Sequence, residues 1–343
     1  MPKKPKAGIR RHGFGFKAES NKFYANRLVS NRILWYTDSV NTYMKTITEQ
    51  LNRFDIRQNV PLSELTSFRI GGDAAFVWQV DDYVHLSEII TLCRDMQLRY
   101  VLLGKGTNVL AEDAGYPGLV IRFDRPLHSP VYDGCTIRAC AGMSLTQLAK
   151  ETVANGLQGM ECLSGIPGTV GGACAMNAGA YGAEIRQILQ RVRVLRDGQD
   201  QWVDVKPEML GYRTSVFSFP NCIVLEAELR LLPDDGGALD RMKDCTQKRK
   251  EKQPLEYPSA GSVFKRPTGY FAGALIQESG CKGLTVGGAQ VSEKHAGFIV
   301  NRGGATEQDV SELIAVVQAR VREHTGVSLE CEIKRLGDLQ CIY

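Results

Sequence analysis

The sequence predicts a mixed α+β or α/β fold, because two kinds of segment alternate along it. Residues 82–98 repeat apolar side chains at helical spacing, and residues 100–103 follow as a short apolar strand. The turn-forming cluster PDDGG at 233–237 separates this region from a second series of such segments. We therefore expect more than one domain, with a break near residue 233.

The remaining segments continue the alternation. Further strands are expected at 119–123 and, with alternating faces, at 192–195 and 223–232; further helices are expected at 144–155, 237–252, 270–279 and 307–325. A closing strand is expected at 327–335. Its alternation would place Glu330 and Glu332 together on the face opposite Leu329 and Ile333.

Composition excludes several classes of protein. Apolar residues make up 43% and charged residues 23% of the 343 residues, which is typical of a soluble protein with two or three domains. No stretch is long and apolar enough to span a membrane, and we find no basic segment followed by an apolar one of the kind that forms a secretory signal, so we expect a cytoplasmic protein. The ten cysteines form no C-x-x-C pair, which predicts reduced thiols and neither a disulfide scaffold nor a metal site.

The net positive charge of the chain comes from its N-terminal end. Residues 1–33 hold nine Lys or Arg and one acid, whereas the other 310 residues hold 33 bases and 37 acids, so bulk charge does not indicate nucleic-acid binding. Residues 1–46 lack periodicity, and we interpret them as a disordered extension; contact with RNA or membrane is the alternative to an extension without function. Helix-like sequence starts directly after Met44, which is a candidate functional start.

Two loops are rich in glycine and carry almost no charge. One is GKGTN at 104–108, directly after an apolar strand, and the other is SGIPGTVGGACAMNAGAYG at 164–182. Glycine lets backbone N–H groups converge on an anion, so both loops suit a bound pyrophosphate, although a tight turn explains each one separately. Neither contains the P-loop or the G-x-G-x-x-G fingerprint, and the G-x-G at Gly13 lacks its third glycine.

Seven motifs in a fixed order resemble one family. They are TSFRIGG at 66–72, LGKGTNVL at 103–110, the loop at 164–182, GYRTSVF at 211–217, PLEYPSAGSVFKRP at 254–267, GGAQVSEKHAGFIVN at 287–301 and LECEIKRLG at 329–337. In this order they closely resemble the UDP-N-acetylenolpyruvoylglucosamine reductases, flavoenzymes that make UDP-N-acetylmuramate for peptidoglycan. The resemblance covers about residues 51–337, and the short stretch between Arg213 and Gly261 is similar to the type II branch. Thr107 stands where the family more often has serine.

The resemblance implies an α+β fold in which two subdomains of the vanillyl-alcohol-oxidase type enclose FAD, followed by a substrate-binding α+β domain. We accordingly expect an extension at 1–46, an FAD-binding domain at 47–232 split near 123, and a substrate-binding domain at 233–343. FAD is expected to bind noncovalently, with NADPH as hydride donor. The cofactor-binding residues implied are Arg69, Gly104, Lys105, Gly106, Thr107, Asn108, Val109, Pro167, Gly168, Val170, Gly171, Gly172, Asn177, Ala178, Gly179 and Ile185.

The implied reaction reduces the enolpyruvyl group of UDP-N-acetylglucosamine-enolpyruvate. Such a site must stabilise negative charge beside a carboxylate and deliver one proton. Spacing alone marks Arg213 as a loop arginine and Ser262 as a turn hydroxyl, and it does not choose between Glu330 and Glu332. The motifs Y-R-x-S, A-G-S and L-E-x-E assign Arg213 to the substrate carboxylate, Ser262 as proton donor and Glu332 as the catalytic acid.

Substrate contacts are expected at Tyr212, Lys265, Arg266, Lys282 and His295. The charged run QKRKEK at 247–252 is interpreted as a solvated helix face. The only partner expected is this small-molecule substrate, and we expect a monomer without metal.

Two other functions remain open at this stage. One is an FAD oxidoreductase of the same fold that uses oxygen and tethers its flavin covalently. The five histidines lie outside both flavin loops, but Cys174 lies inside the second, which leaves a cysteinyl link open. The other is a non-catalytic nucleotide-binding module, which could lose Arg213, Ser262 and Glu332, whereas all three are present.

Overall fold

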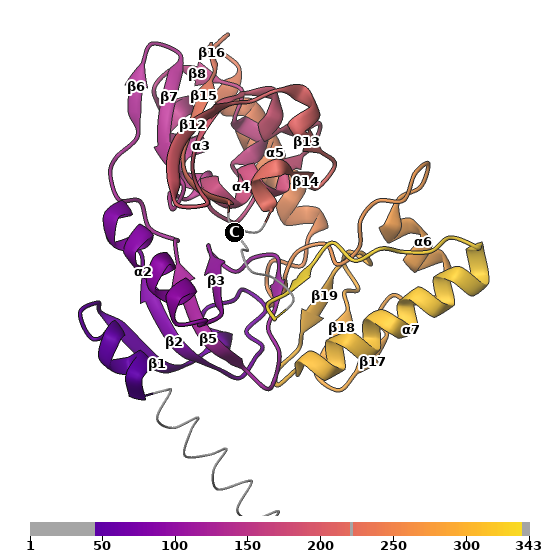
Figure 1. Cartoon of the computed structure of the whole chain (residues 1–343). Coiled ribbons are helices and arrows are strands. Elements are labelled where there is room, and N and C mark those ends of the chain that lie inside the picture. Colours follow the sequence, from indigo (N-terminus) through magenta and orange to yellow (C-terminus); the bar gives the residue numbers. More distant parts are fainter. Residues whose placement is uncertain (1–44, 220–221, 338–343) are drawn as a thin grey trace, which may run out of the picture. The chain divides into compact units, whose positions relative to one another are not determined.

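A computed structural model describes residues 45–219 and 222–337 (Figure 1). The chain divides into two compact units, residues 1–53 and 54–343. In the described part of the first unit a helix covers residues 45–51. Nearly all of the predicted extension at 1–46, including the G-x-G at Gly13, lies outside the described residues. All elements named below belong to the second unit.

A four-stranded sheet opens the second unit, with strand order β1-β2-β5-β3. Its strands are β1 (Ile56–Pro61), β2 (Asp73–Gln79), β5 (Tyr116–Arg122) and β3 (Tyr100–Leu103). β1 is antiparallel to β2, whereas β5 runs parallel to both β2 and β3. The helix α2 (Tyr83–Asp95), capped by the Asp82 side chain, links β2 to β3. The loop at 104–108 leaves the carboxyl end of β3, the side of a parallel sheet where ligands commonly bind.

A five-stranded antiparallel sheet follows, with order β12-β11-β15-β7-β6. Its strands are β6 (Val131–Asp133), β7 (Thr136–Cys140), β11 (Leu189–Arg196), β12 (Gln199–Asp204) and β15 (Cys222–Arg230). The strand at β15 is confirmed, but its predicted alternation is wrong, because residues 222–229 are all buried. Both faces of this central strand are covered, and the buried Glu226 and Glu228 are neutralised by Arg193 and Arg191.

The predicted helices are present, and local caps set both ends of α7 (Glu307–Thr325). α3 (Leu145–Ala154), α5 (Ala238–Lys252) and α6 (Ala272–Glu278) lie within the predicted segments. α7 (Glu307–Thr325) has the predicted bounds: Thr306 and Asp309 form a capping box at its start, and Gly326 ends it with φ of 74°. The sequence signal was strong here because each cap is local.

Short elements complete the unit and carry most of the loops around the site. They are η1 (Leu62–Glu64), β4 (Val109–Leu110), β8 (Leu157–Gln158), η2 (Glu161–Leu163), α4 (Val170–Met176), β9 (Gly179–Ala180), β10 (Ala183–Glu184), η3 (Ile185–Gln187), η4 (Pro207–Met209), β13 (Leu210–Gly211), β14 (Thr214–Ser215), η5 (Val216–Ser218) and β16 (Leu232–Pro233). Of these, β9 pairs with β10 and β13 with β14 as tight hairpins.

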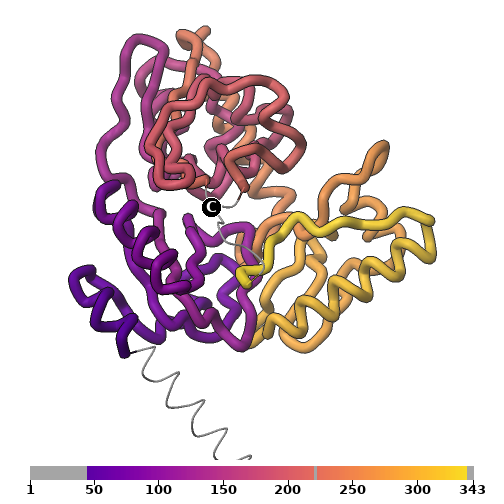
Figure 2. Tube along the Cα trace, viewed as in Figure 1, coloured from indigo at the N-terminus to yellow at the C-terminus, as the bar shows by residue number. Residues whose placement is uncertain are grey.

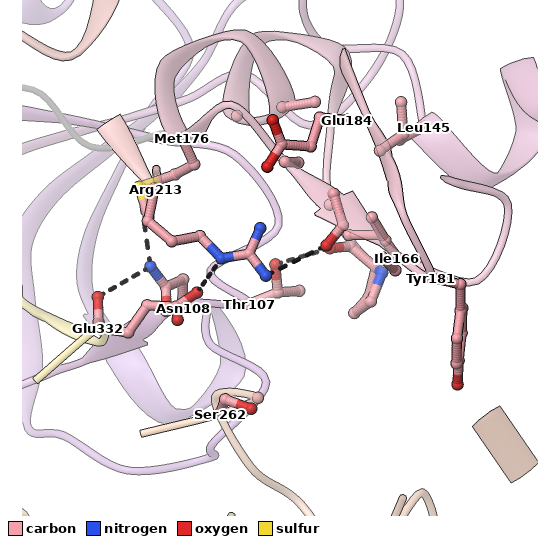
Figure 3. Close-up of a pocket in the computed structure, with 18 of the residues that line it drawn as sticks. Thr107, Asn108, Leu145, Ile166, Met176, Tyr181, Glu184, Arg213, Ser262 and Glu332 are labelled. Atoms are coloured by element: carbon pink, nitrogen blue, oxygen red, sulfur yellow. Dashed lines mark hydrogen bonds and ion pairs between the residues drawn. The ribbon is translucent and has the colours of Figure 1, made fainter. Parts of the chain in front are cut away.

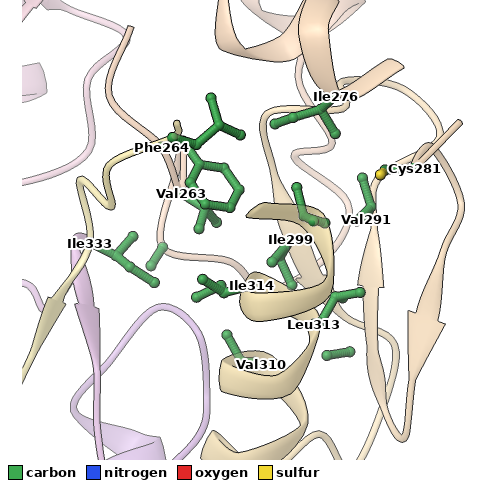
Figure 4. Packing of buried hydrophobic residues seen from close by; sticks show 14 of the residues in the cluster. Val263, Phe264, Ile276, Cys281, Val291, Ile299, Val310, Leu313, Ile314 and Ile333 are labelled. Atoms are coloured by element: carbon green, nitrogen blue, oxygen red, sulfur yellow. The ribbon is translucent and has the colours of Figure 1, made fainter. Parts of the chain in front are cut away.

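A core built around α7 lies in the C-terminal part, and Phe68, Ile70 and Leu110 from earlier in the chain join it (Figure 4). The three-stranded sheet β17 (Thr285–Val286), β18 (Ala289–Val291) and β19 (Ile299–Asn301) packs against the helix. Apolar residues at helical spacing, including Val310, Leu313 and Val317, are fully buried in this core. A rigid core here fixes the neighbouring residues 260–264, which lead into the site.

The prediction of a regular closing strand at 327–335 is wrong. Only β20 (Lys334–Arg335) is a strand there, and it pairs in parallel with β4, whereas Cys331 forms an isolated bridge to Phe264. In Figure 2 the yellow C-terminal end of the trace comes back to the purple part of the chain, where β4 lies. Divided pairing between two partners breaks the regular alternation, because each partner imposes its own register.

The cysteine prediction is wrong at one pair. Cys162 in η2 and Cys245 in α5 are joined by a disulfide, with Cα atoms 5.4 Å apart. Arg241 of α5 also forms an ion pair with Glu161, at 2.8 Å. Both contacts tie α5 to residues before the predicted domain break near 233, so a break after α5 accounts for them better. Two cysteines 83 residues apart give no sequence signal of their pairing.

Within residues 45–219 and 222–337, no helix is long and apolar enough to cross a membrane. The same residues contain no cluster of His, Cys, Asp and Glu that could hold a metal ion.

Candidate active site

A pocket of about 750 Å³ lies where the glycine loops meet the C-terminal part (Figure 3). Its walls come from the loop after β3, the segment around α4, the β9–β10 hairpin, the β13–β14 turn and residues 260–262. Six of the lining side chains are basic and two are carboxylates. The basic residues are Lys105, Arg186, Arg213, Arg249, Lys252 and Arg266, and the acids are Glu184 and Glu332. A cavity of this size and charge suits a large anionic ligand.

Arg213 occupies the tight turn between β13 and β14. Gly211 pairs with Thr214, so Tyr212 and Arg213 are the two central residues of this hairpin. The φ of Arg213 is 55°, in the left-handed region that favours glycine. Such a backbone costs about 1–3 kcal/mol for an ordinary residue and is concentrated at functional sites. The strain places the Arg213 guanidinium in the pocket, where one Nη donates to the Gly179 carbonyl at 3.1 Å.

Arg213 and Glu332 form an ion pair across the pocket. Arg213 Nε lies 2.9 Å from Glu332 Oε1 (Figure 3). The buried Nε–H makes no aligned hydrogen bond, so charge rather than direction holds this contact. The Asn108 amide donates to the Glu332 carbonyl at 3.3 Å, and the Glu332 N–H donates to the Val263 carbonyl at 2.7 Å. These bonds fix the backbone from which the carboxylate projects.

Burial changes the acidity of Glu332. Desolvation raises the pKa of its carboxyl above the usual 4.5, and Arg213 opposes this shift only in part. By contrast, the Glu330 side chain is 74% exposed, and its pairing with Lys265 lowers the pKa. The two glutamates, which the predicted strand placed together, therefore differ in partner, exposure and acidity. Glu332 is the one that can hold a proton inside the pocket.

Ser262 lines the same pocket as this ion pair. Its backbone forms a bridge with Phe298, and Gly261 before it has φ of 78°. The Ser262 hydroxyl makes no hydrogen bond to any residue within 45–219 or 222–337 and lines the pocket. A hydroxyl with no internal acceptor is free to donate to a ligand.

The two glycine loops face each other in this pocket. Thr107 donates its hydroxyl to the Pro167 carbonyl at 3.1 Å, which ties the first loop to the second. Lys105 donates to the Ser144 hydroxyl at 2.8 Å, and burial lowers the pKa of its ammonium group. Gly168 has φ of 143°, which a side chain rarely adopts. The loops thus offer small walls, exposed backbone and one lysine, as a pyrophosphate requires.

Comparison with known proteins identifies both parts. Residues 74–205 match the FAD binding domain, and residues 253–336 match the C-terminal domain of UDP-N-acetylenolpyruvoylglucosamine reductase. The UDP-N-acetylenolpyruvoylglucosamine reductases of Clostridium perfringens and Alkaliphilus oremlandii are each 42% identical over 303 residues, which are 99% of their length and 87–88% of this chain. The chain belongs to the UDP-N-acetylenolpyruvoylglucosamine reductase family.

A solved structure of the same family has the same fold. The UDP-N-acetylenolpyruvylglucosamine reductase of Thermus caldophilus is 37% identical and superposes with a TM-score of 0.68. The comparison covers 82% of this chain and 99% of that chain. The α+β fold with an FAD-binding part and a family-specific C-terminal part is therefore confirmed. The bounds of the domains stay a prediction.

Eight of the expected cofactor residues of this reductase family line the pocket: Lys105, Thr107, Asn108, Pro167, Gly168, Gly172, Ala178 and Gly179. Eight do not: Arg69, Gly104, Gly106, Val109, Val170, Gly171, Asn177 and Ile185. Arg69 is exposed, and Val109, Val170 and Ile185 are buried in the core. The motif therefore contains supporting residues as well as lining ones.

The supporting residues hold the loops in shape. A Cβ on Gly106 would lie 2.4 Å from the Leu65 carbonyl oxygen, so only glycine fits that close approach. The Gly171 N–H donates to the Ala141 carbonyl at 2.9 Å and is not available to a ligand. Asn177 donates to the Gly211 carbonyl at 2.8 Å, which positions the strand leading to Arg213.

Three of the five expected substrate residues line the pocket. Tyr212 accepts a hydrogen bond from the Arg266 N–H, and the Arg266 guanidinium stacks 3.9 Å from the centre of the Phe271 ring. His295 Nδ1 accepts from the Gly297 N–H, and burial lowers its pKa, so the ring is neutral near pH 7. Lys265 and Lys282 do not line the pocket: Lys265 pairs with Glu330, and Lys282 donates to Gln277.

Sequence reasoning missed part of the site. Tyr181 and Glu184 of the β9–β10 hairpin line the pocket, as do Arg186 and Gln187 of η3 and the two aromatic residues Phe271 and Phe298. So do Arg249, Lys252 and Gln253, which corrects the interpretation of 247–252 as a purely solvated helix face. The segment 180–183 reads A-Y-G-A, and a glycine at this point is the sequence signal that could have predicted a hairpin turn here.

These residues fit a flavin dinucleotide. The lining combines small neutral walls with a surplus of cations. Cys174 is fully buried and lies outside the pocket lining, and burial raises the pKa of its thiol to about 12. A protonated thiol away from the pocket does not support the cysteinyl flavin link that the sequence left open.

Proposed function

We propose that this chain reduces the enolpyruvyl group of UDP-N-acetylglucosamine-enolpyruvate with NADPH, giving UDP-N-acetylmuramate for peptidoglycan. One observation carries the proposal: Arg213, Glu332 and Ser262 line one pocket together with the two glycine loops. The three residues come from segments up to 119 positions apart in sequence. Noncovalent FAD, when bound there, supplies the hydride chemistry.

Arg213 would hold the substrate carboxylate. A guanidinium can donate two parallel hydrogen bonds to a carboxylate, and negative charge spreads into that carboxylate as the double bond is reduced. The backbone strain at Arg213 and its ion pair with Glu332 fix the guanidinium before substrate arrives. Arg213 therefore acts on both binding and the reaction.

Ser262 would donate the proton to the carbon beside the carboxylate. Its hydroxyl lines the pocket and has no internal acceptor. Glu332 is the second acid of the site, because burial raises its pKa and favours the protonated form. The Arg213 guanidinium contacts the Glu332 carboxyl at 2.9 Å, so a substrate carboxylate bound by Arg213 would also change the acidity of Glu332.

The test is anaerobic NADPH oxidation by the purified yellow protein, with and without UDP-N-acetylglucosamine-enolpyruvate. We expect NADPH oxidation to continue beyond one equivalent per FAD only when the enolpyruvyl substrate is present. In a parallel aerobic assay, continued oxidation that needs oxygen and ignores this substrate would instead indicate an oxidase of the same fold. Acid precipitation supplies a second readout: a yellow supernatant is expected for noncovalent FAD, and a yellow pellet would contradict it.

A further inference from the structure

Arg249 differs from every other residue of the charged run 247–252. It stands in the last turn of α5 and is half-buried, whereas its neighbours Gln247, Lys248 and Lys250 are exposed. A Cβ added to Gly165, at the start of the second glycine loop, would lie 3.0 Å from the Arg249 side chain. The guanidinium therefore packs against the loop and lines the pocket.

The Arg249 guanidinium has no carboxylate partner in the described part of the chain. Two exposed bases of α5 do have carboxylate partners: Lys243 pairs with Asp240, and Lys248 with Asp244. The two carboxylates of the pocket are also taken, because Glu184 pairs with Arg186 and Glu332 with Arg213. Desolvation lowers the pKa of Arg249, and the Tyr181 hydroxyl is the neighbour that offsets it.

A half-buried cation without a counter-ion destabilises the empty protein. Its retention in an open pocket is explained if a ligand supplies the anion. The guanidinium fork matches a phosphate group through two hydrogen bonds. The adjacent Lys252 and Lys105 add positive charge on the same pocket, as a diphosphate requires.

We propose that Arg249 binds a phosphate group of a nucleoside diphosphate in this pocket. Two sources share this chemistry: the pyrophosphate of FAD and the diphosphate of the UDP-linked substrate. The inference deepens the proposed function and, for the second source, rests on it. Arg249 would then be a binding residue rather than part of a solvated helix face.

The experiment compares Arg249→Gln and Arg249→Lys with wild type and with the control Lys248→Gln. The control removes one positive charge from the same helix, at a residue outside the pocket. One arm titrates FAD into the apo-protein and follows quenching of flavin fluorescence. The other titrates UDP, and uridine as the phosphate-free control, into the FAD-loaded protein by calorimetry.

We expect Arg249→Gln to weaken one of these affinities by about 10- to 100-fold, the usual effect of a lost charged hydrogen-bond pair. Loss in the FAD arm assigns the cofactor's phosphate, and loss for UDP but not uridine assigns the substrate's. Arg249→Lys should retain part of the affinity, and Lys248→Gln should stay within about twofold of wild type.

Apo-protein stability separates binding from a structural role. Because the variant removes an uncompensated charge, the thermal midpoint of apo Arg249→Gln should equal or exceed that of wild type. A lower midpoint with unchanged FAD and UDP affinities would overturn the proposal, as would two affinities within twofold of wild type. If wild type itself binds no UDP, the proposed substrate is wrong, and the FAD arm alone decides the role of Arg249.

Discussion

Arg213 shows what single-residue reasoning can and cannot supply. Its motif identified the residue, but neither its left-handed backbone nor its contact with Glu332, 119 positions later, is visible in the sequence. In the sequence only the family motif distinguished Glu332 from Glu330. The physical difference between them is the burial of Glu332, which depends on the whole fold. Arg249 was missed for the same reason, because a charged run on a helix gives no sign of which face is covered.

Ser262→Ala should separate the two halves of the reaction. A proton donor is needed only after the flavin has been reduced, so NADPH should bleach the variant at a rate near wild type. Reoxidation by the enolpyruvyl substrate should slow by about 10²–10⁴-fold, the usual contribution of a positioned general acid. Stopped-flow absorbance of the flavin follows each half separately.

Glu332→Gln should resemble the serine variant, whereas Glu330→Gln is the matched control and should be mild, because that side chain is 74% exposed. Arg213→Ala should weaken substrate binding as well as slow reoxidation. Equal slowing of both halves in Ser262→Ala would mean a structural role, and another donor would then be required.

Glu332 should also give stability a distinct pH dependence. Its pKa is raised in the folded protein, so its contribution to the free energy of unfolding is fully present below 4.5, the unfolded value, and is lost as pH rises through the folded pKa. The thermal unfolding midpoint of Glu332→Gln, measured relative to that of wild type, should therefore rise between pH 4 and pH 8. Glu330 has a lowered pKa, so the midpoint of Glu330→Gln relative to that of wild type should fall over the same range. A parallel response of the two variants would contradict the assignment of the buried carboxyl.

At the scale of elements, helices were predictable and several strands were not. The spacing and caps of α7 are contained in about twenty consecutive residues, so local sequence sets its bounds. The closing segment 327–335 has the alternation of a strand, yet it pairs partly with Phe264 and partly with β4. Strand pairing depends on distant partners, which a single sequence does not specify.

The Cys162–Cys245 link should be detectable and stabilising. A non-reducing digest should contain one peptide that joins the two cysteines, which reduction separates. Closing a loop of 83 residues restricts the unfolded chain, so Cys245→Ser should lower the free energy of unfolding by about 2–4 kcal/mol under oxidising conditions. The same variant measured in reducing buffer is the control, because wild type then lacks the bond too. Free thiols at both positions in freshly purified protein would contradict the disulfide.

At the scale of the molecule, the C-terminal end of the described chain pairs with the strand that follows the first glycine loop. Glu332 lies two residues before β20, which pairs with β4, and β4 directly follows the first glycine loop. The C-terminal part therefore brings Glu332 into the pocket beside the first glycine loop, while most of its apolar side chains pack around α7. Composition and periodicity predicted the fold class, but not this closure, which joins residues more than 200 positions apart.

The last prediction concerns the N-terminal end. A shortened chain that begins at Met44 should fold, bind FAD and turn over at the wild-type rate, because every site residue lies beyond residue 100. Relatives align over 99% of their own length but over 87% of this chain, so part of it has no counterpart in them. The removed residues 1–43 carry nine bases and two acids, so the net charge changes from +4 to −3. The shortened protein should thus lose retention on a cation exchanger while kcat/KM and flavin content per chain stay unchanged. Insoluble protein, or soluble protein with lower flavin content, would show that residues 1–43 contribute to the fold or the site.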